Sequence, residues 1–164
     1  MPTTLNDVRD FLAQRRIALV GLSRNPKDFS HVVFREMFQR GYDMVPVNPG
    51  ATELENRRCF AHLQEITPRV DGALIMTMPQ DTDRVVRDCA EAGVRRVWMH
   101  RGGGQGAVSK EAAEFCLQNG IRLVEGYCPL MFLAGTPFFH RVHGFFMKVA
   151  GGYPAQAKGT SHTA

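Results

Sequence analysis

A short loop near the start of the chain combines the residue types that bind phosphate. It spans residues 21–27, with the sequence GLSRNPK, and it leads into a helix whose N-cap we expect at Ser30. A helix N-terminus presents backbone N–H groups and a partial positive charge, and both attract anions. Arg24 and Lys27 add two full positive charges, although solvated loop residues often look the same. The predicted phosphate site consists of Gly21, Ser23, Arg24, Lys27 and Ser30.

The same loop does not fit the dinucleotide fingerprint G-x-G-x-x-G. Its three glycine positions hold Gly21, Ser23 and Pro26. Ser23 would obstruct the close backbone approach to a pyrophosphate or bond to the phosphate instead, and Pro26 cannot provide the close helix packing of the third glycine. An NAD site also needs an acidic residue at the end of the second strand, where this chain has Asn48. An NAD(P)-dependent oxidoreductase therefore stays only as the alternative.

The elements that must position this loop follow a recurring pattern. An amphipathic helix, a glycine and an apolar strand follow one another around Gly41, Gly93 and Gly120. Glycine can adopt the left-handed conformation that ends a helix because it has no Cβ. Two further apolar strands are predicted at residues 17–22 and 72–78.

Alternating strands and helices at this spacing predict an α/β protein. We expect a Rossmann-like, doubly wound and mainly parallel sheet of five or six strands, with helices on both faces. Residues 53–68 are predicted to form a loop with one short strand and a turn. The expected organisation is a domain over residues 1–129, a helical extension over 130–154 and a flexible tail over 155–164. Helix caps are expected at Thr4, with Asp7 completing a capping box, and at Ser109.

Several of these stretches together resemble a known family, the small stand-alone CoA-binding proteins related to the CoA-binding domain of the succinyl-CoA synthetase alpha subunit. The resemblance covers about Val8 to Pro129. It rests on VGLS at 20–23 with Pro26 and Ser30, GY at 41–42, VPVNP at 45–49, VD at 70–71, VW at 97–98, GI at 120–121 and CP at 128–129.

This resemblance implies binding of CoA or an acyl-CoA at the carboxyl edge of the sheet, without chemistry of its own. Asn48 and Pro49 would border the adenosine end, and a neutral Asn48 suits the ribose 3′-phosphate better than an acid would. The synthetase's second domain, with its phosphohistidine, is absent, so ligase activity is not implied. The resemblance places the following residues along the groove for the nucleotide and pantetheine: Met76, Thr77, Met78, Pro79 and, where a polar amide is common, His100.

Four other residues could carry chemistry, and each also has a structural explanation. His100, which precedes a run of glycines, is a candidate general acid or base. Cys128 could be a buried apolar residue or could form a mixed disulfide with the CoA thiol. His140 and His143 share one helix face, but two ligands do not make a metal site, and a packed or interfacial pair is the simpler explanation.

Composition narrows the remaining classes of protein. The 164 residues are 44% hydrophobic and 22% charged, which excludes a disordered chain. We expect no secretory signal, no membrane insertion and no nucleic-acid partner, because neither an apolar stretch of sufficient length nor a DNA-binding module is visible. Four widely spaced cysteines favour the cytoplasm. The aromatic-rich stretch 128–153 could pack on the domain itself, form a homodimer interface or contact a membrane surface.

Overall fold

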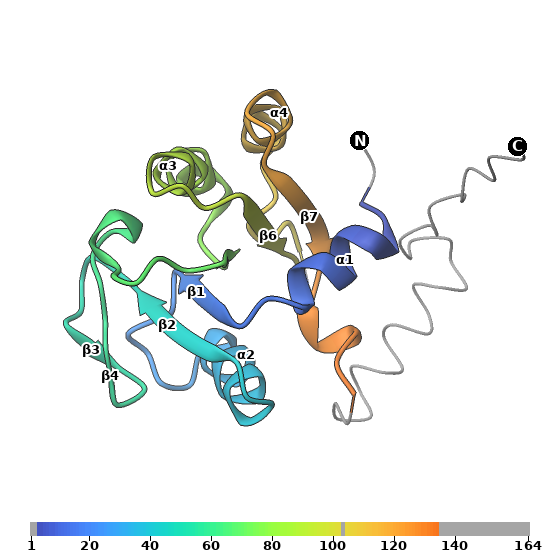
Figure 1. The fold of residues 1–164 in the computed structure, drawn as a ribbon. Coiled ribbons are helices and arrows are strands. Elements are labelled where there is room, and N and C mark those ends of the chain that lie inside the picture. Colours follow the sequence, from blue (N-terminus) through green and yellow to red (C-terminus); the bar gives the residue numbers. More distant parts are fainter. Residues whose placement is uncertain (1–2, 103, 135–164) are drawn as a thin grey trace, which may run out of the picture.

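Five parallel strands form the centre of the fold, in the order β2-β1-β5-β6-β7 (Figure 1). The computed structural model describes residues 3–102 and 104–134. This sheet confirms the predicted Rossmann-like α/β architecture. The strand bounds are β1 (Arg16–Val20), β2 (Asp43–Val47), β5 (Gly72–Ile75), β6 (Arg96–His100) and β7 (Arg122–Tyr127).

Helices cover both faces of the sheet because each strand alternates its apolar side chains between the two faces. Ala18 and Val20 of β1 belong to a core that includes α3 and α4, whereas Ile17 and Leu19 belong to a core that includes α1 and α2 (Figure 1). None of the helices within the described residues is long and apolar enough to cross a membrane. Their bounds are α1 (Leu5–Leu12), α2 (Phe29–Gln39), α3 (Pro79–Glu91), α4 (Lys110–Gln118) and the 3₁₀ turns η1 (Leu63–Glu65) and η2 (Pro129–Met131).

Two of the three predicted helix caps are confirmed. Thr4 and Asp7 form the capping box of α1, and the Ser109 hydroxyl accepts the backbone N–H of Ala112 in α4. The predicted cap of α2 at Ser30 is wrong, because Asp28 caps this helix and Ser30 lies inside its first turn. Asp28 directly precedes the helix, so its negatively charged side chain can accept hydrogen bonds from the first N–H groups. Ser30 lies two residues further on, inside the first turn, and is neutral.

The region between β2 and β5 is more ordered than predicted. It holds a two-stranded hairpin, β3 (Glu53–Leu54) and β4 (Arg57–Arg58), instead of the one short strand expected. Glu55 and Asn56 form its turn, each with a φ of 54°. Because such turns normally contain glycine, the sequence did not reveal this one. The predicted C-terminal helix lies outside the described residues beyond Ala134, as do His140 and His143.

One carboxylate ties α1 to the edge of the sheet where the strands begin. Asp10 accepts hydrogen bonds from Arg96 of β6 at 2.8 Å and lies 2.9 Å from Arg122 of β7. The hydrogen bond from Arg96 is the main cause that lowers the pKa of Asp10, burial opposes it, and Arg122 adds to it. The ionised carboxylate therefore holds α1 on β6 and β7.

We predict that Asp10→Asn lowers the free energy of unfolding at pH 7 by about 1 kcal/mol. Because the folded pKa is depressed, this contribution is present above the unfolded value of about 3.9 and is lost as the pH falls through the folded pKa. Urea unfolding at pH 7 and at about pH 3 measures the difference. Glu114→Gln is the control, since Glu114 is exposed and 3.9 Å from Lys110. A wild-type advantage that persists unchanged at low pH would contradict this assignment.

Candidate functional site

The carboxyl ends of β1 and β5 meet at the point where the strand order reverses. From β1 the chain passes to β2 on one side, while β5 pairs with β1 on the other. Gly21 follows β1 with a φ of +92°, and a Cβ added there would lie 2.9 Å from the backbone nitrogen of Thr77. Only glycine allows this close approach. Ligands of open α/β sheets bind at such a reversal.

Two clefts open on either side of this contact. The first, of about 300 Å³, lies between the ends of β1 and β2 and helix α3, and the second, of about 470 Å³, lies between the ends of β5 and β6. Thr77 lines both clefts, so they adjoin at one residue. The structure brings these predicted site residues to the clefts: Gly21, Asn48, Pro49, Met76, Thr77, Met78, Pro79 and His100.

The remaining four predicted residues lie in the loop and first turn above the clefts and line neither of them: Ser23, Arg24, Lys27 and Ser30. Much of the hydrogen bonding of this segment is internal. The Ser23 N–H donates to the Ser30 hydroxyl at 3.1 Å, and the Ser23 hydroxyl accepts the N–H of Asn25 at 3.1 Å. The Lys27 N–H donates to the Asn25 side chain at 3.1 Å. The segment is therefore shaped by its own side chains.

Asp28 is the feature of this loop that sequence reasoning missed. Its carboxylate accepts the N–H of Ser30 at 2.9 Å and the Ser30 hydroxyl at 2.6 Å. The bond from the Ser30 side chain is the first cause that lowers the pKa of Asp28, so the group is ionised at neutral pH. A negative charge thus already occupies the N-terminus of α2, where we predicted phosphate. An aspartate before a helix was a visible signal for this cap.

The buried side chain of His31 also stabilises the loop after β1. Its Nε2 lies 2.8 Å from the carbonyl oxygen of Ser23, and its Nδ1 bonds to the carboxylate of Glu55 in the β3–β4 turn. Arg35 donates to the same carboxylate at 2.9 Å, and this bond is the first cause that lowers the pKa of Glu55. The hairpin is thereby connected to the loop after β1.

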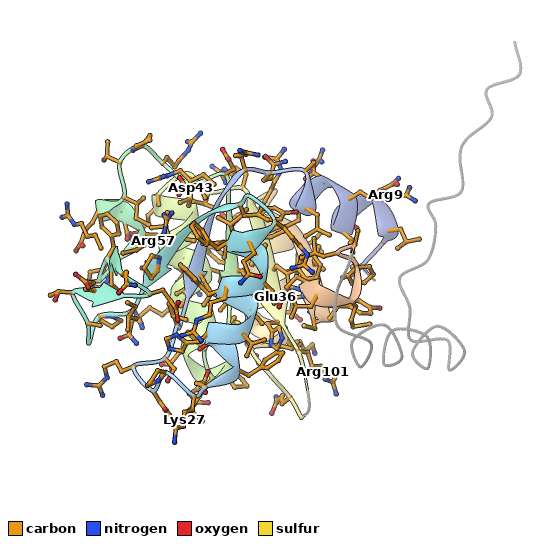
Figure 2. The ribbon with its side chains drawn as sticks, turned by 90° about the horizontal axis from the view of Figure 1, so that it is seen from below. Arg9, Lys27, Glu36, Asp43, Arg57 and Arg101 are labelled. Atoms are coloured by element: carbon orange, nitrogen blue, oxygen red, sulfur yellow. The ribbon has the colours of Figure 1, made fainter. Side chains whose placement is uncertain are left out.

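Asn48 organises the rim of the first cleft through both ends of its amide. The amide nitrogen donates to the carbonyl of Leu22 at 2.8 Å, and the amide oxygen accepts the N–H of Gly50 at 2.7 Å. Arg24 lies across this turn, because a Cβ on Gly50 would lie 3.5 Å from its Cδ and Nε. Lys27, by contrast, points outward (Figure 2). Arg24 is therefore held near the rim, and Arg84 of α3 lines the cleft itself.

A second glycine shapes the wall of the second cleft. Gly106 has a φ of +62°, and a Cβ there would lie 2.4 Å from the carbonyl oxygen of His100, which also accepts the N–H of Ala107 at 2.8 Å. The glycine-rich loop therefore folds back tightly on β6. The imidazole of His100 is buried and lies 5.9 Å from the ring of Phe29, centroid to centroid.

Thr82 connects this wall to the end of β5. Its hydroxyl lies 2.9 Å from the carbonyl oxygen of Ala107 and 3.2 Å from the hydroxyl of Thr77, and the residue is fully buried. The shared residue of the two clefts is thus fixed to the loop after β6. The sequence alone did not indicate this structural role of Thr82.

Cys128 sits in an apolar environment behind the site. It is buried in the core shared with α1 and α2, and burial raises the pKa of its thiol to about 11. A protonated, inaccessible thiol is a poor partner for disulfide exchange, so the structure favours the packing explanation over the mixed disulfide. Within residues 3–102 and 104–134, no three histidine, cysteine or acidic side chains gather as metal ligands.

The parallel sheet, the glycine-dependent reversal and the paired clefts define a Rossmann-like α/β domain with clefts at the position where such folds bind ligands. Residues 15–134 match the family described as "CoA binding domain", and the chain belongs to this family. The match confirms the resemblance seen in the sequence. It gives no support to the alternative of an NAD(P)-dependent oxidoreductase.

Individual relatives agree with this assignment. The uncharacterized protein YneT of Bacillus subtilis is 28% identical over 123 residues, which cover 74% of this chain and 88% of YneT. The alpha subunit of the ADP-forming acetate–CoA ligase II of Pyrococcus furiosus is 27% identical over 72% of this chain, but the match spans only 27% of the ligase subunit. A hypothetical protein from Pyrococcus horikoshii shares the fold with a TM-score of 0.72 and 26% identity, covering 79% of this chain and 91% of that protein.

We predict that Gly21→Ala destabilises the protein more than Gly120→Ala. Both glycines have a positive φ, which costs about 1–2 kcal/mol for alanine. Only at position 21 would the new Cβ also clash with Thr77, whereas nothing lies within 4 Å at position 120. Thermal unfolding of both variants tests this, and equal losses of stability would show that the Gly21–Thr77 contact is not constrained.

Proposed function

We propose that this protein binds CoA or an acyl-CoA across the two clefts at the carboxyl edge of the sheet. The observation that carries the proposal is the Gly21–Thr77 contact, because it leaves two clefts joined at one residue in a member of a CoA-binding family. CoA is a long ligand with a polar nucleotide and a less polar pantetheine arm, which suits two adjoining clefts of different lining.

The chemistry of each cleft supports an orientation for the ligand. The adenosine end lies in the first cleft beside Asn48 and Pro49, with Arg24 at its rim. The diphosphate passes over Gly21 towards the start of α3, a helix whose N-terminus no side chain caps and whose first turn contains Asp81. The pantetheine arm then lies along Met76, Met78 and Pro79 in the second cleft. This placement moves the phosphates away from the N-terminus of α2, where Asp28 lies.

We propose a binding role rather than a catalytic one. Two polar side chains near the clefts are committed to structural bonds, Asn48 to Leu22 and Gly50, and Thr82 to Ala107. Such a site holds its ligand without moving protons or forming covalent bonds, as a carrier, sensor or regulator does. All four cysteines are unpaired and buried, which suits a cytoplasmic location.

Calorimetric titration of the full chain with CoA, acetyl-CoA, NADH, NADPH and ATP tests this function. We expect CoA or acetyl-CoA to bind most tightly. At 100 times its dissociation constant the ligand should stabilise the fold by about 2.7 kcal/mol. Tighter binding of NADH than of CoA would overturn the proposal, and steady turnover of an acyl-CoA by the chain alone would overturn the non-catalytic role.

We predict that Arg24→Ala weakens CoA binding about tenfold, the equivalent of roughly 1.4 kcal/mol, and weakens dephospho-CoA binding far less. Arg24 lies at the adenosine end, where the ribose 3′-phosphate would be. Titration of both ligands measures the difference. Arg9→Ala is the control, because Arg9 lies far from this loop. Figure 2 shows Arg9 at the opposite end of the molecule from Lys27, which belongs to the same loop as Arg24. Equal losses with both ligands would instead place Arg24 on the diphosphate.

A further inference from the structure

An apolar groove lies between α1 and η2, and none of its lining residues lines either of the two clefts. It has a volume of about 590 Å³. In Figure 1, α1 lies next to β7, close to where the described chain ends. Apart from Arg9, the groove is lined by apolar side chains from α1, from the end of η2 and from the residues that follow η2: Leu5, Val8, Leu12, Met131, Phe132 and Leu133.

The chain itself leads into this groove. Ala134, the last described residue, is one of its lining residues, and Leu133 precedes it. The carbonyl oxygen of Ala134 accepts a hydrogen bond from Arg40 at 3.1 Å, which fixes this end of the chain beside α2. Residues 135–164 therefore start at the wall of an apolar groove.

The sequence that follows has the pattern of an amphipathic helix. Thr136 and Pro137 are residue types favoured at the N-cap and the first helical position. Spacings of four, three and four residues then place one apolar stripe along 138–149, and Met147 falls on the opposite face. The stripe consists of Phe138, Val142, Phe145 and Val149, with Phe139 and Phe146 beside it.

We propose that residues 136–150 dock with this apolar stripe in the groove between α1 and η2 of their own chain. Both surfaces are apolar, so their contact removes apolar area from water. A short tether holds the segment at an effective concentration of the order of millimolar, which exceeds the concentration of a second copy in solution. A homodimer formed by the same segment is the competing outcome.

Cross-linking tests which chain supplies the segment. The double variant Leu12→Cys with Val142→Cys is treated with a short bismaleimide, and the four native cysteines are buried. An equal mixture of ¹⁴N-labelled and ¹⁵N-labelled chains is used, and the linked peptides are identified by mass spectrometry. We expect linked pairs of one isotope only, and a much lower yield from Leu12→Cys with Met147→Cys. Pairs of mixed isotope, or no linked pair, would overturn the proposal.

Hydrogen exchange provides a second test in variants that remain folded. Phe145→Asp should make the amides of α1 exchange about tenfold faster, because a charge on the stripe releases the segment. Met147→Asp is the matched control and should leave α1 unchanged. Equal exchange of α1 in both variants would overturn the proposal. Both variants should bind CoA as the wild type does, so this outcome is separate from that of the proposed function.

Discussion

The contact between Gly21 and the backbone of Thr77 is the constraint on which the site depends. With no Cβ at position 21, the loop after β1 can pass directly against the end of β5, and a side chain there would have to overlap the backbone. The two clefts lie on either side of this contact and share Thr77. Gly21 therefore has a structural role in addition to allowing a phosphate to come close. It brings the two halves of the sheet together at the reversal of strand order.

A loop held this closely must satisfy its own polar groups, and the residues that do so also direct where an anion can bind. Asp28 bonds to Ser30 at the first turn of α2, and His31 supports the carbonyl of Ser23. The carboxylate of Asp28 makes the N-terminus of α2 unfavourable for phosphate, since like charges repel. The N-terminus of α3 has no such side-chain cap. Because Asp81 also lies in the first turn of α3, the two helix starts differ in their uncapped N–H groups and not in the presence of a negative charge.

The sheet and its order of elements could be predicted because glycine ends helices and apolar strands follow, a pattern local in sequence. The cleft residues that lie at or directly after strand ends could be placed as well, but those that α3 contributes to the first cleft were missed. The brace of His31 and Glu55 could not, because 24 residues separate them and only the hairpin brings them together. Asp28 was missed for a different reason: two polar residues near one helix start compete for the cap, and spacing alone did not rank them.

Net charge, finally, describes this protein less well than the placement of its charges. The chain carries +4, yet residues 1–120 hold 16 basic and 15 acidic residues. At the amino edge of the sheet, Asp10 and Asp43 each bind two arginines, so the positive charges there have carboxylate partners. In the described part of the chain, no carboxylate lies within 4 Å of the charged nitrogens of Arg24 or Lys27 at the carboxyl edge. A nearly neutral domain can therefore still attract an anion at the carboxyl edge, because the cations of the loop after β1 have no carboxylate partner among the described residues to offset them, although Asp81 and Asp88 line the first cleft nearby.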